Sequence, residues 1–216
     1  MSKYSNLKKY QHLVHFALTS EDINSLSYAV LLRNAIDIYL KKLNALIKDL
    51  GTKSKSWASI PVLARTHGQA ASPSSLGKEI KVFHHRLSRQ KNILKKIKPL
   101  AKFGGATGNF HTLDLADSGI DWLSKTKKFL SLFRVDQNPM TTQIEPHDGI
   151  AEISHCIQRI NNILIDLNQD MWIYISNDIF KLKLKDGEIG SSTMPHKVNP
   201  IDFENSEGNL GLSSSL

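Results

Sequence analysis

The strongest hydrophobic pattern in the chain lies between Asp148 and Ile179. Apolar residues recur there at alternating steps of three and four positions for more than three heptads. This spacing predicts one long helix with a narrow buried seam, as in a helical bundle or coiled coil. The seam consists of Ile150, Ile153, Ile157, Ile160, Leu164, Leu167, Met171 and Tyr174.

Two further long helices are predicted by apolar stripes of the same kind. The first spans residues 21–50, where Gly51 is expected to end it. The second is expected to open at Pro73 and Ser74, and shorter helices are predicted from Asp121 to about Phe133 and after Pro200. The two long stripes are Leu32, Ile36, Tyr39, Leu43, Leu46 and Leu50, then Leu76, Ile80, Phe83, Leu87, Leu94 and Ile97.

No stretch shows the sustained alternation of a β-strand, so the predicted fold class is all-α. Residues 65–69 are interpreted as a loop and the glycine-rich residues 102–109 as a turn. A helix over 148–179 would be roughly 45–50 Å long. A globule of this chain length is only about 35–40 Å across. We therefore expect an elongated bundle that shares its seams with other subunits.

Length and composition agree with one helical domain. The chain has 216 residues and 40% hydrophobic content, enough for one sizeable core. Residues 1–14 are weakly patterned, so the domain is predicted over 15–216. The single cysteine, Cys156, excludes an internal disulfide and is interpreted as a packing residue. Neither a membrane span nor a secretory signal is found, which favours a cytoplasmic protein.

The net charge of +8 and the pI of about 9.5 raise the question of nucleic-acid binding. Most of the excess lies between Lys78 and Lys98, where eight Lys and Arg residues accompany one acid, Glu79. This segment has almost no aromatic residues for base stacking and no nucleic-acid motif. We favour a solvated helix face, or a positive field that attracts a phosphate-bearing small substrate.

The most unusual composition lies in residues 187–200. Two glycines and two prolines there flank paired serines and a His-Lys pair, between segments predicted as helices. Glycine and proline interrupt regular structure, whereas the serines, His196 and Lys197 are chemically reactive groups. This combination is typical of a loop that closes over a substrate.

Four motifs resemble one known family. The stretch from Gly190 to Pro200 resembles the signature loop of the fumarase/aspartase superfamily. Residues 19–22 (Thr-Ser-Glu-Asp) resemble the first superfamily motif. Residues 65–69 (Arg-Thr-His-Gly-Gln) and 141–147 resemble segments of the adenylosuccinate lyase family, as does His196 within the signature loop. The family usually has proline where this chain has Ala70. The resemblance runs from about residue 15 to 213.

The resemblance implies elimination of fumarate from adenylosuccinate, giving AMP, and from the succinylated aminoimidazole carboxamide ribotide of purine biosynthesis. It implies that His67 is the general acid and Ser191 the base, supported by Ser192. Side-chain pKa values alone would favour His196 as the base, because a serine hydroxyl is a very poor base at neutral pH. Glu204 matches the acid that keeps the catalytic histidine protonated.

Other matched positions are expected to bind substrate. Hydroxyl, amide and cationic groups suit a succinyl carboxylate, and His15 is expected near the substrate phosphate. The predicted substrate-binding residues are His15, Thr19, Ser20, Thr66, Gln143, Lys197 and Asn199.

The resemblance implies no metal and no organic cofactor. Glu152 and His155 have the Glu-x-x-His spacing of di-metal bundles, but they lie off the predicted seam and have no second copy. No nucleic-acid or membrane partner is expected.

Family members are homotetramers in which each site draws on three subunits, and they are roughly twice as long as this chain. We therefore hypothesise a truncated chain that covers the family's central helical domain. The alternative is a catalytically incomplete fragment that acts only as a helical assembly module.

Overall fold

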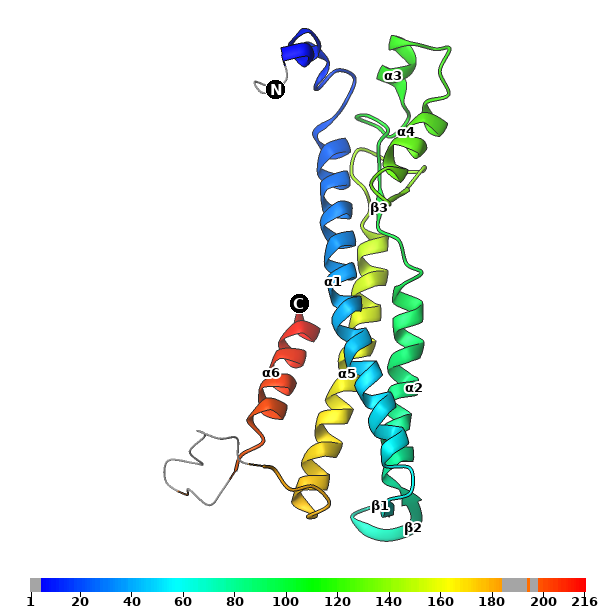
Figure 1. Cartoon of the computed structure of the whole chain (residues 1–216). Helices are drawn as coiled ribbons and strands as arrows, with labels where there is room; N and C mark the ends of the chain where they lie inside the picture. The colour runs from blue at the N-terminus through cyan, green and yellow to red at the C-terminus, as the bar shows by residue number, and fades with distance from the viewer. Residues whose placement is uncertain (1–4, 184–193, 195–197) are drawn as a thin grey trace. The chain divides into compact units, whose positions relative to one another are not determined.

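The computed structural model describes residues 5–183, 194 and 198–216. Helices account for most of this part of the chain, which confirms the predicted helical fold class (Figure 1). None of the described helices is both long enough and apolar enough to cross a membrane.

Contacts divide the chain into two compact units. The first contains Met1–Lys42 and Lys95–Ile153, and the second contains Leu43–Leu94 and Ser154–Leu216. Helix α1 (Ser20–Ser56) and helix α5 (Asp148–Ser176) each contribute residues to both units.

The first unit has a small core between α1 and the segment that follows residue 95. Leu26 and Ala29 of α1 pack there with Ala101, Leu130 and Val135. Beside α1 and α5, the unit contains a 3-10 helix η1 (Ser5–Leu13), helices α3 (His111–Ala116) and α4 (Trp122–Ser131), and the two-residue parallel strands β3 (Leu100–Ala101) and β4 (Asp136–Gln137).

Helix α4 begins where the sequence predicts it. The side chain of Asp121 accepts a hydrogen bond of 3.0 Å from the backbone N–H of Ser124, which satisfies a free donor of the first turn. The same hydrogen bond lowers the pKa of the Asp121 carboxyl below its usual range. The Asp121 side chain therefore caps α4 at this boundary.

The second unit is built around helix α2 (Leu76–Leu94). Every residue of its predicted stripe within the helix is buried, namely Leu76, Ile80, Phe83, Leu87 and Leu94. Cys156 of α5 is also buried, in agreement with its predicted packing role. The other elements of this unit are β1 (Pro61–Thr66), β2 (Gln69–Ser75), α6 (Ile201–Ser215) and the adjoining parts of α1 and α5.

The structure corrects two helix boundaries. Helix α1 does not end at Gly51 but continues to Ser56. A Cβ atom at Gly51 would lie 3.0 Å from Cδ2 of His84, so this glycine allows α1 and α2 to approach closely. Helix α2 begins at Leu76 rather than at Pro73, because residues 69–75 form strand β2.

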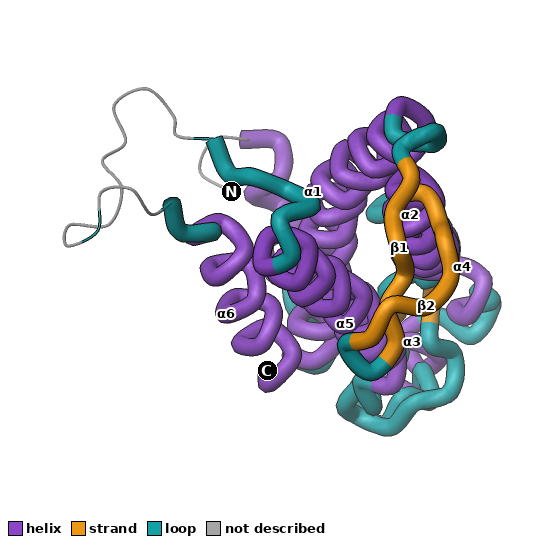
Figure 2. Tube along the Cα trace, turned by 90° about the horizontal axis from the view of Figure 1, so that it is seen from below, coloured by secondary structure: helices purple, strands orange, loops and turns teal. Residues whose placement is uncertain are grey.

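The structure also corrects the expectation that the chain has no strands. β1 and β2 form an antiparallel hairpin that pairs Pro61 with Ser75 and Thr66 with Gln69, seen in orange in Figure 2. Its residues include alanines, serines and Pro73, which do not alternate between polar and apolar. Most of their side chains are exposed or half-buried, so no buried face produces the pattern by which strands are recognised.

Helix α6 contacts α5 through polar side chains. Asn161 Nδ2 donates to Ser213 Oγ at 3.0 Å, and Asn168 Nδ2 donates to Ser206 Oγ at 2.9 Å. The two asparagines lie seven residues apart, as do the two serines, so the helices run antiparallel in a fixed register. Asn161 and Asn168 are buried, which extends the buried face of α5 beyond the predicted apolar seam.

Gly77 provides a test of close packing within the second unit. A Cβ atom there would lie 2.6 Å from Cα of Ala58, against backbone that cannot move aside easily. We expect Gly77→Ala to reduce the free energy of unfolding by about 1–3 kcal/mol through overpacking. The measurement is urea unfolding followed by circular dichroism.

Gly208 of α6 is the matched control, since nothing lies within 4 Å of a Cβ atom there. Gly208→Ala should stabilise the helix by about 0.5–1 kcal/mol, because alanine restricts the unfolded chain more than glycine does. Equal effects of the two substitutions would contradict the packing described for Gly77.

Candidate active site

The first predicted motif forms the N-terminus of α1. Thr19 precedes the helix and is buried, whereas Ser20 is its first residue and is exposed. The carboxylate of Asp22 reaches back and accepts a hydrogen bond of 2.9 Å from the backbone N–H of Thr19. This is the return bond of a capping box, and it fixes the turn that presents Thr19 and Ser20.

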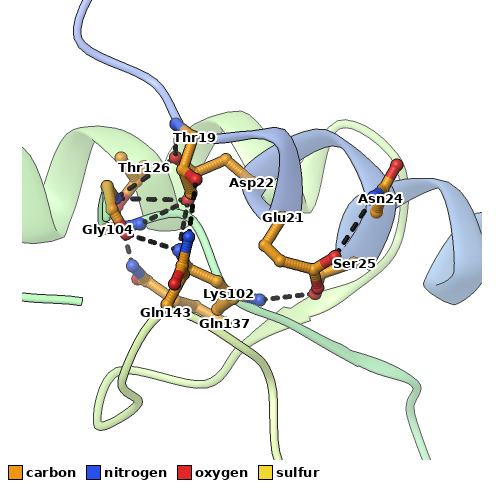
Figure 3. A network of polar contacts seen from close by, with 11 residues as sticks. Thr19, Glu21, Asp22, Asn24, Ser25, Lys102, Gly104, Thr126, Gln137 and Gln143 are labelled. Atoms are coloured by element: carbon orange, nitrogen blue, oxygen red, sulfur yellow. Dashed lines mark hydrogen bonds and ion pairs between the residues drawn. The ribbon is translucent and has the colours of Figure 1, made fainter. Parts of the chain in front are cut away.

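The Asp22 carboxylate has a second role that its position in the sequence does not reveal. Lys102 Nζ lies 2.9 Å from Asp22 Oδ1, and both side chains are completely buried. The same carboxylate accepts hydrogen bonds from the backbone N–H groups of Gly104 and Gly105, at 3.0 and 3.2 Å (Figure 3). Lys102 Nζ also donates to the Gly105 carbonyl oxygen at 2.6 Å. A buried ion pair is tolerated when the remaining polar atoms are satisfied in this way.

This network holds the glycine-rich segment 102–109 against the start of α1. The backbone N–H of Lys102 donates to Ser25 Oγ at 3.0 Å, one helical turn beyond Asp22. Residues 104–109 contain bends and turns, as predicted. The segment is therefore part of the architecture around the first motif and not only a connection between helices.

The glycine-rich segment in turn supports the predicted substrate segment 141–147. A Cβ atom at Gly108 would lie 2.8 Å from the carbonyl carbon of Thr141 and 2.9 Å from the carbonyl oxygen of Thr142. Gly108 also has a φ of 77°, which favours glycine. No other residue fits this position without moving Thr141 and Thr142.

The structure brings Gln143 to the first motif. Gln143 Nε2 donates to Thr19 Oγ1 at 3.5 Å, a long hydrogen bond between residues 124 positions apart in the sequence. The Gln143 side chain is otherwise exposed, as is Ser20. Ser20 and Gln143 thus present accessible polar groups beside the buried Thr19 at the positive end of α1, where helix N–H groups favour an anion.

Glu145, two residues after Gln143, holds this segment in place through two hydrogen bonds. Glu145 is buried and accepts hydrogen bonds from Asn138 Nδ2 at 2.9 Å and from the backbone N–H of His147 at 2.7 Å. These bonds connect residues 138–147 into one folded stretch directly before α5. Sequence reasoning assigned no role to Glu145.

His15 lies in the turn before α1 and its side chain is exposed. Its backbone carbonyl oxygen accepts a hydrogen bond of 3.4 Å from Leu18 N–H. Within the described residues, its imidazole makes no hydrogen bond to Thr19, Ser20 or Gln143. Its predicted contact with a substrate phosphate remains a prediction.

His67 lies at the tip of the β1–β2 hairpin in the second unit. His67 and Gly68 have φ values of 53° and 72°, and they connect the paired residues Thr66 and Gln69. Two central residues with positive φ are typical of a type I′ turn, which suits the twist of a hairpin. Arg65 Nη1 donates to the Gly68 carbonyl oxygen at 3.2 Å and braces the turn. Thr66 and His67 are both exposed.

The signature loop is only partly described. Ser191, Ser192, His196 and Lys197 lie outside the described residues. Asn199 is half-buried, and its carbonyl oxygen accepts a hydrogen bond of 2.9 Å from Ile201 N–H at the start of α6.

Glu204 is exposed in the first turn of α6. Among the described residues, no hydrogen bond or ion pair joins it to His67. Its predicted support of the catalytic histidine therefore remains a prediction. Glu152 and His155, whose spacing prompted the metal interpretation, are both exposed.

Sequence reasoning missed the group that organises the first motif. Lys102, Gly104, Gly105 and Gly108 were assigned to a turn without function, and Asp22 was placed in the first motif without a role of its own. One signal could have identified them. Lys102 is a lone charge between Ala101 and Phe103, and a lysine in so apolar a stretch is buried only when it is paired.

Comparison with known proteins agrees with the motifs. Residues 2–212 match the lyase family. The chain belongs to this family. It is 49% identical over 217 residues to an adenylosuccinate lyase of Buchnera aphidicola (subspecies Schizaphis graminum), and 47% identical over 220 residues to one of Escherichia coli K12. Each alignment covers 100% of this chain and 48% of the relative. The predicted resemblance to adenylosuccinate lyases is confirmed, and this lyase-family chain spans about half the length of the curated relatives it matches.

Solved structures agree on the fold. A 3-carboxy-cis,cis-muconate lactonizing enzyme from Pseudomonas putida aligns with a TM-score of 0.76 and 22% identity, covering 97% of this chain and 46% of that one. A fumarate lyase from Mesorhizobium sp. BNC1 aligns with a TM-score of 0.72 and 20% identity, covering 93% and 44%. At this level of identity the likeness concerns the fold alone.

The buried pair makes a specific prediction. Lys102→Met leaves the Asp22 carboxylate buried without its cation, and we expect a loss of about 3–5 kcal/mol in the free energy of unfolding. Hydrogen exchange should show the loss first at the amides of Thr19, Gly104 and Gly105, which donate to Asp22.

Lys98→Met is the matched control, because Lys98 pairs with Asp136 at 3.0 Å while both side chains are exposed. An exposed pair contributes about 0–1 kcal/mol. Similar losses in the two variants would show that the Asp22–Lys102 pair does not organise the site.

Proposed function

We propose that this chain carries the chemistry of an adenylosuccinate lyase. The reaction eliminates fumarate from adenylosuccinate to give AMP, and from the succinylated aminoimidazole carboxamide ribotide in purine biosynthesis. The observation that carries the proposal is the junction of Thr19, Ser20 and Gln143 at the N-terminus of α1. Identity of 47–49% to proteins named adenylosuccinate lyase, along the whole chain, supports the same chemistry.

The junction suits one end of a succinyl substrate. A carboxylate needs hydrogen-bond donors and a positive potential, and it gains both from the Ser20 hydroxyl, the Gln143 amide and the first N–H groups of a helix. α1 has 37 residues, so its N-terminus is a full helix terminus and not an isolated turn. The buried network beneath keeps these donors in place before the substrate arrives, which reduces the cost of ordering them on binding.

The proposed elimination uses two further groups. Ser191, as its alkoxide, removes a proton from the carbon next to the substrate carboxylate and becomes a neutral hydroxyl, and the new carbon–carbon double bond forms as the carbon–nitrogen bond breaks. The electron pair of that bond goes to nitrogen, which His67 protonates. Lys197 and Asn199 stabilise the negative charge that develops on the carboxylate.

The remaining predicted residues take supporting roles in this proposal. Thr66 adjoins His67 and binds substrate, Ser192 supports Ser191, and Glu204 supports the protonated histidine. His15 approaches the substrate phosphate. Because family members combine three subunits at each site, we propose that the acid and the base act on one substrate from different copies of the chain. No metal or organic cofactor takes part in these steps.

Binding of the substrate provides the direct test. We expect adenylosuccinate to raise the melting temperature of the purified chain, because a ligand that binds only the folded state stabilises it. Gln143→Leu should reduce this shift by weakening binding about tenfold, as expected for the loss of one hydrogen bond to a charged group. Fumarate release, followed by ultraviolet absorbance, should be lost with His67→Ala.

Gln169→Leu provides the control, because Gln169 is another exposed glutamine but lies on the part of α5 that belongs to the second unit. It should leave the melting shift unchanged. Absence of any shift with adenylosuccinate, or equal losses in both glutamine variants, would contradict the proposed role of the junction.

A second candidate function is helical assembly, and exposed apolar side chains on α1 favour it. Tyr28, Leu31 and Ile38 are 60%, 64% and 65% exposed. Their spacing of three and then seven residues places them on one side of the helix. Large apolar residues in one row are typical of a surface that another subunit covers. We propose that copies of this chain associate through this row, in line with the tetramers of the family.

Light scattering tests the assembly. We expect the wild-type chain to be larger than a monomer, and the double variant Leu31→Asp and Ile38→Asp to be a monomer with unchanged helix content, because each aspartate would bury a charge in the interface. The control double variant Asn44→Asp and Lys48→Asp, at exposed polar positions of α1 beyond the row, should leave the size unchanged. A monomeric wild type would refute both the assembly and catalysis shared between copies.

A further inference from the structure

A hollow of about 340 Å³ opens between α2 and α5 in the second unit. Its lining is basic and polar. α2 contributes His85, Arg86, Arg89 and Gln90, and α5 contributes Arg159, Asn162 and Ile163. We call it the arginine hollow. Among the described residues predicted to bind adenylosuccinate, none lines it.

Two side-chain contacts brace the walls of the arginine hollow. Arg86 Nη2 lies 2.7 Å from Asp166 Oδ2, and Arg159 Nε donates to Gln90 Oε1 at 3.1 Å. Arg86 pairs with Asp166, whereas Gln90, four residues later on α2, pairs with the earlier α5 residue Arg159. The two helices therefore run antiparallel (Figure 1). The opposite walls are therefore held at a defined separation, with guanidinium groups on both sides.

The charge of the arginine hollow is strongly unbalanced. Three guanidinium groups line it, and no carboxylate of the described residues does. Arg86 pairs with Asp166 and also interacts electrostatically with Asp170, both outside the lining. In the described part of the chain, no carboxylate forms an ion pair with Arg89, which is exposed. Arg159 likewise forms no ion pair with a described carboxylate, and its Nε donates to the neutral amide oxygen of Gln90.

The surrounding surface adds to the positive potential. The pKa of His84, on the same helix, is lowered from its usual value by burial and then by the charges of Lys81, His85, Lys91 and Lys55. The proposed lyase chemistry gives no role to the basic stretch from Lys78 to Lys98. Its charges produce a positive electrostatic potential around this part of α2.

We propose that the arginine hollow binds a small phosphorylated anion of the pyrophosphate class. Guanidinium groups offer paired N–H donors that match two oxygens of one phosphoryl group. Arg89 on one wall and Arg159 on the other can each take one phosphoryl group of a diphosphate, while Asn162 supplies a neutral donor.

The size and lining of the hollow narrow the ligand class. Small-molecule sites occupy about 300–1,000 Å³, so this hollow lies near the lower end of that range. Ile163 is the apolar residue of the lining, and no described Phe, Tyr or Trp side chain lines the hollow to stack on a base. The lining therefore fits the phosphate groups of a ligand and not a nucleobase.

Calorimetric titration of the full chain with sodium pyrophosphate tests the proposal. We expect saturable binding that weakens as salt rises from about 50 to about 200 mM, because the contacts are between exposed charges. Arg89→Gln and Arg159→Gln should each weaken binding about tenfold, as one charge-assisted contact is lost. Arg159→Lys keeps the charge but not the paired donors, so it should restore binding only in part.

Lys48→Gln is the matched control, since it removes one positive charge from an exposed position of α1 in the same unit. It should leave pyrophosphate binding unchanged. Three results would overturn the proposal: no binding at millimolar pyrophosphate, equal weakening by Lys48→Gln and Arg89→Gln, or displacement of pyrophosphate by a much lower concentration of an acidic peptide. The last result would identify the surface as a protein-docking site. Arg89 has no ion pair within the described residues, so its substitution leaves the fold intact and the test remains valid.

Discussion

The buried ion pair between Asp22 and Lys102 is the interaction on which the first unit depends. Transfer of two charges from water into a protein interior is costly, and the cost is offset only when every remaining polar atom finds a partner. Here the partners are backbone groups of the glycine-rich segment, so the ion pair connects two parts of the chain that lie far apart in the sequence. Because these parts are connected, the side chains of Thr19 and Gln143 come within hydrogen-bond distance of each other.

Glycines in this protein serve close approach more than flexibility. Gly108 allows the backbone of Thr141 and Thr142 to lie against the glycine-rich segment, Gly77 allows α2 to pack on the end of α1, and Gly51 accommodates His84. In each case the absence of a side chain allows a functional or core element to pack closely. The basic surface of α2 is a separate feature, and its guanidinium groups are held in position by contacts with α5.

Much of the fold could be predicted because burial leaves a periodic trace in a helix. Five of the six predicted stripe residues are buried in α2, while Ile97 lies beyond its end, and the long helix α5 was found from its seam, although it ends at Ser176 and not at Ile179. The hairpin was missed because its strands bury little and so carry no alternating pattern. Gly51 was misread for a related reason, since local rules assign glycine to a helix end and do not include the neighbouring helix that makes it necessary.

The sequence by itself determined the helical class, the family resemblance and the identity of the candidate chemical groups. These depend on local spacing and on motifs that keep their order along the chain. Only the tertiary structure decided that Asp22 is a buried anion, that Lys102 is its cation, and that Gln143 meets Thr19. The physical reason is that ion pairs, close backbone contacts and long-range hydrogen bonds join residues up to 124 positions apart, and no local pattern records which distant partner satisfies a buried polar group.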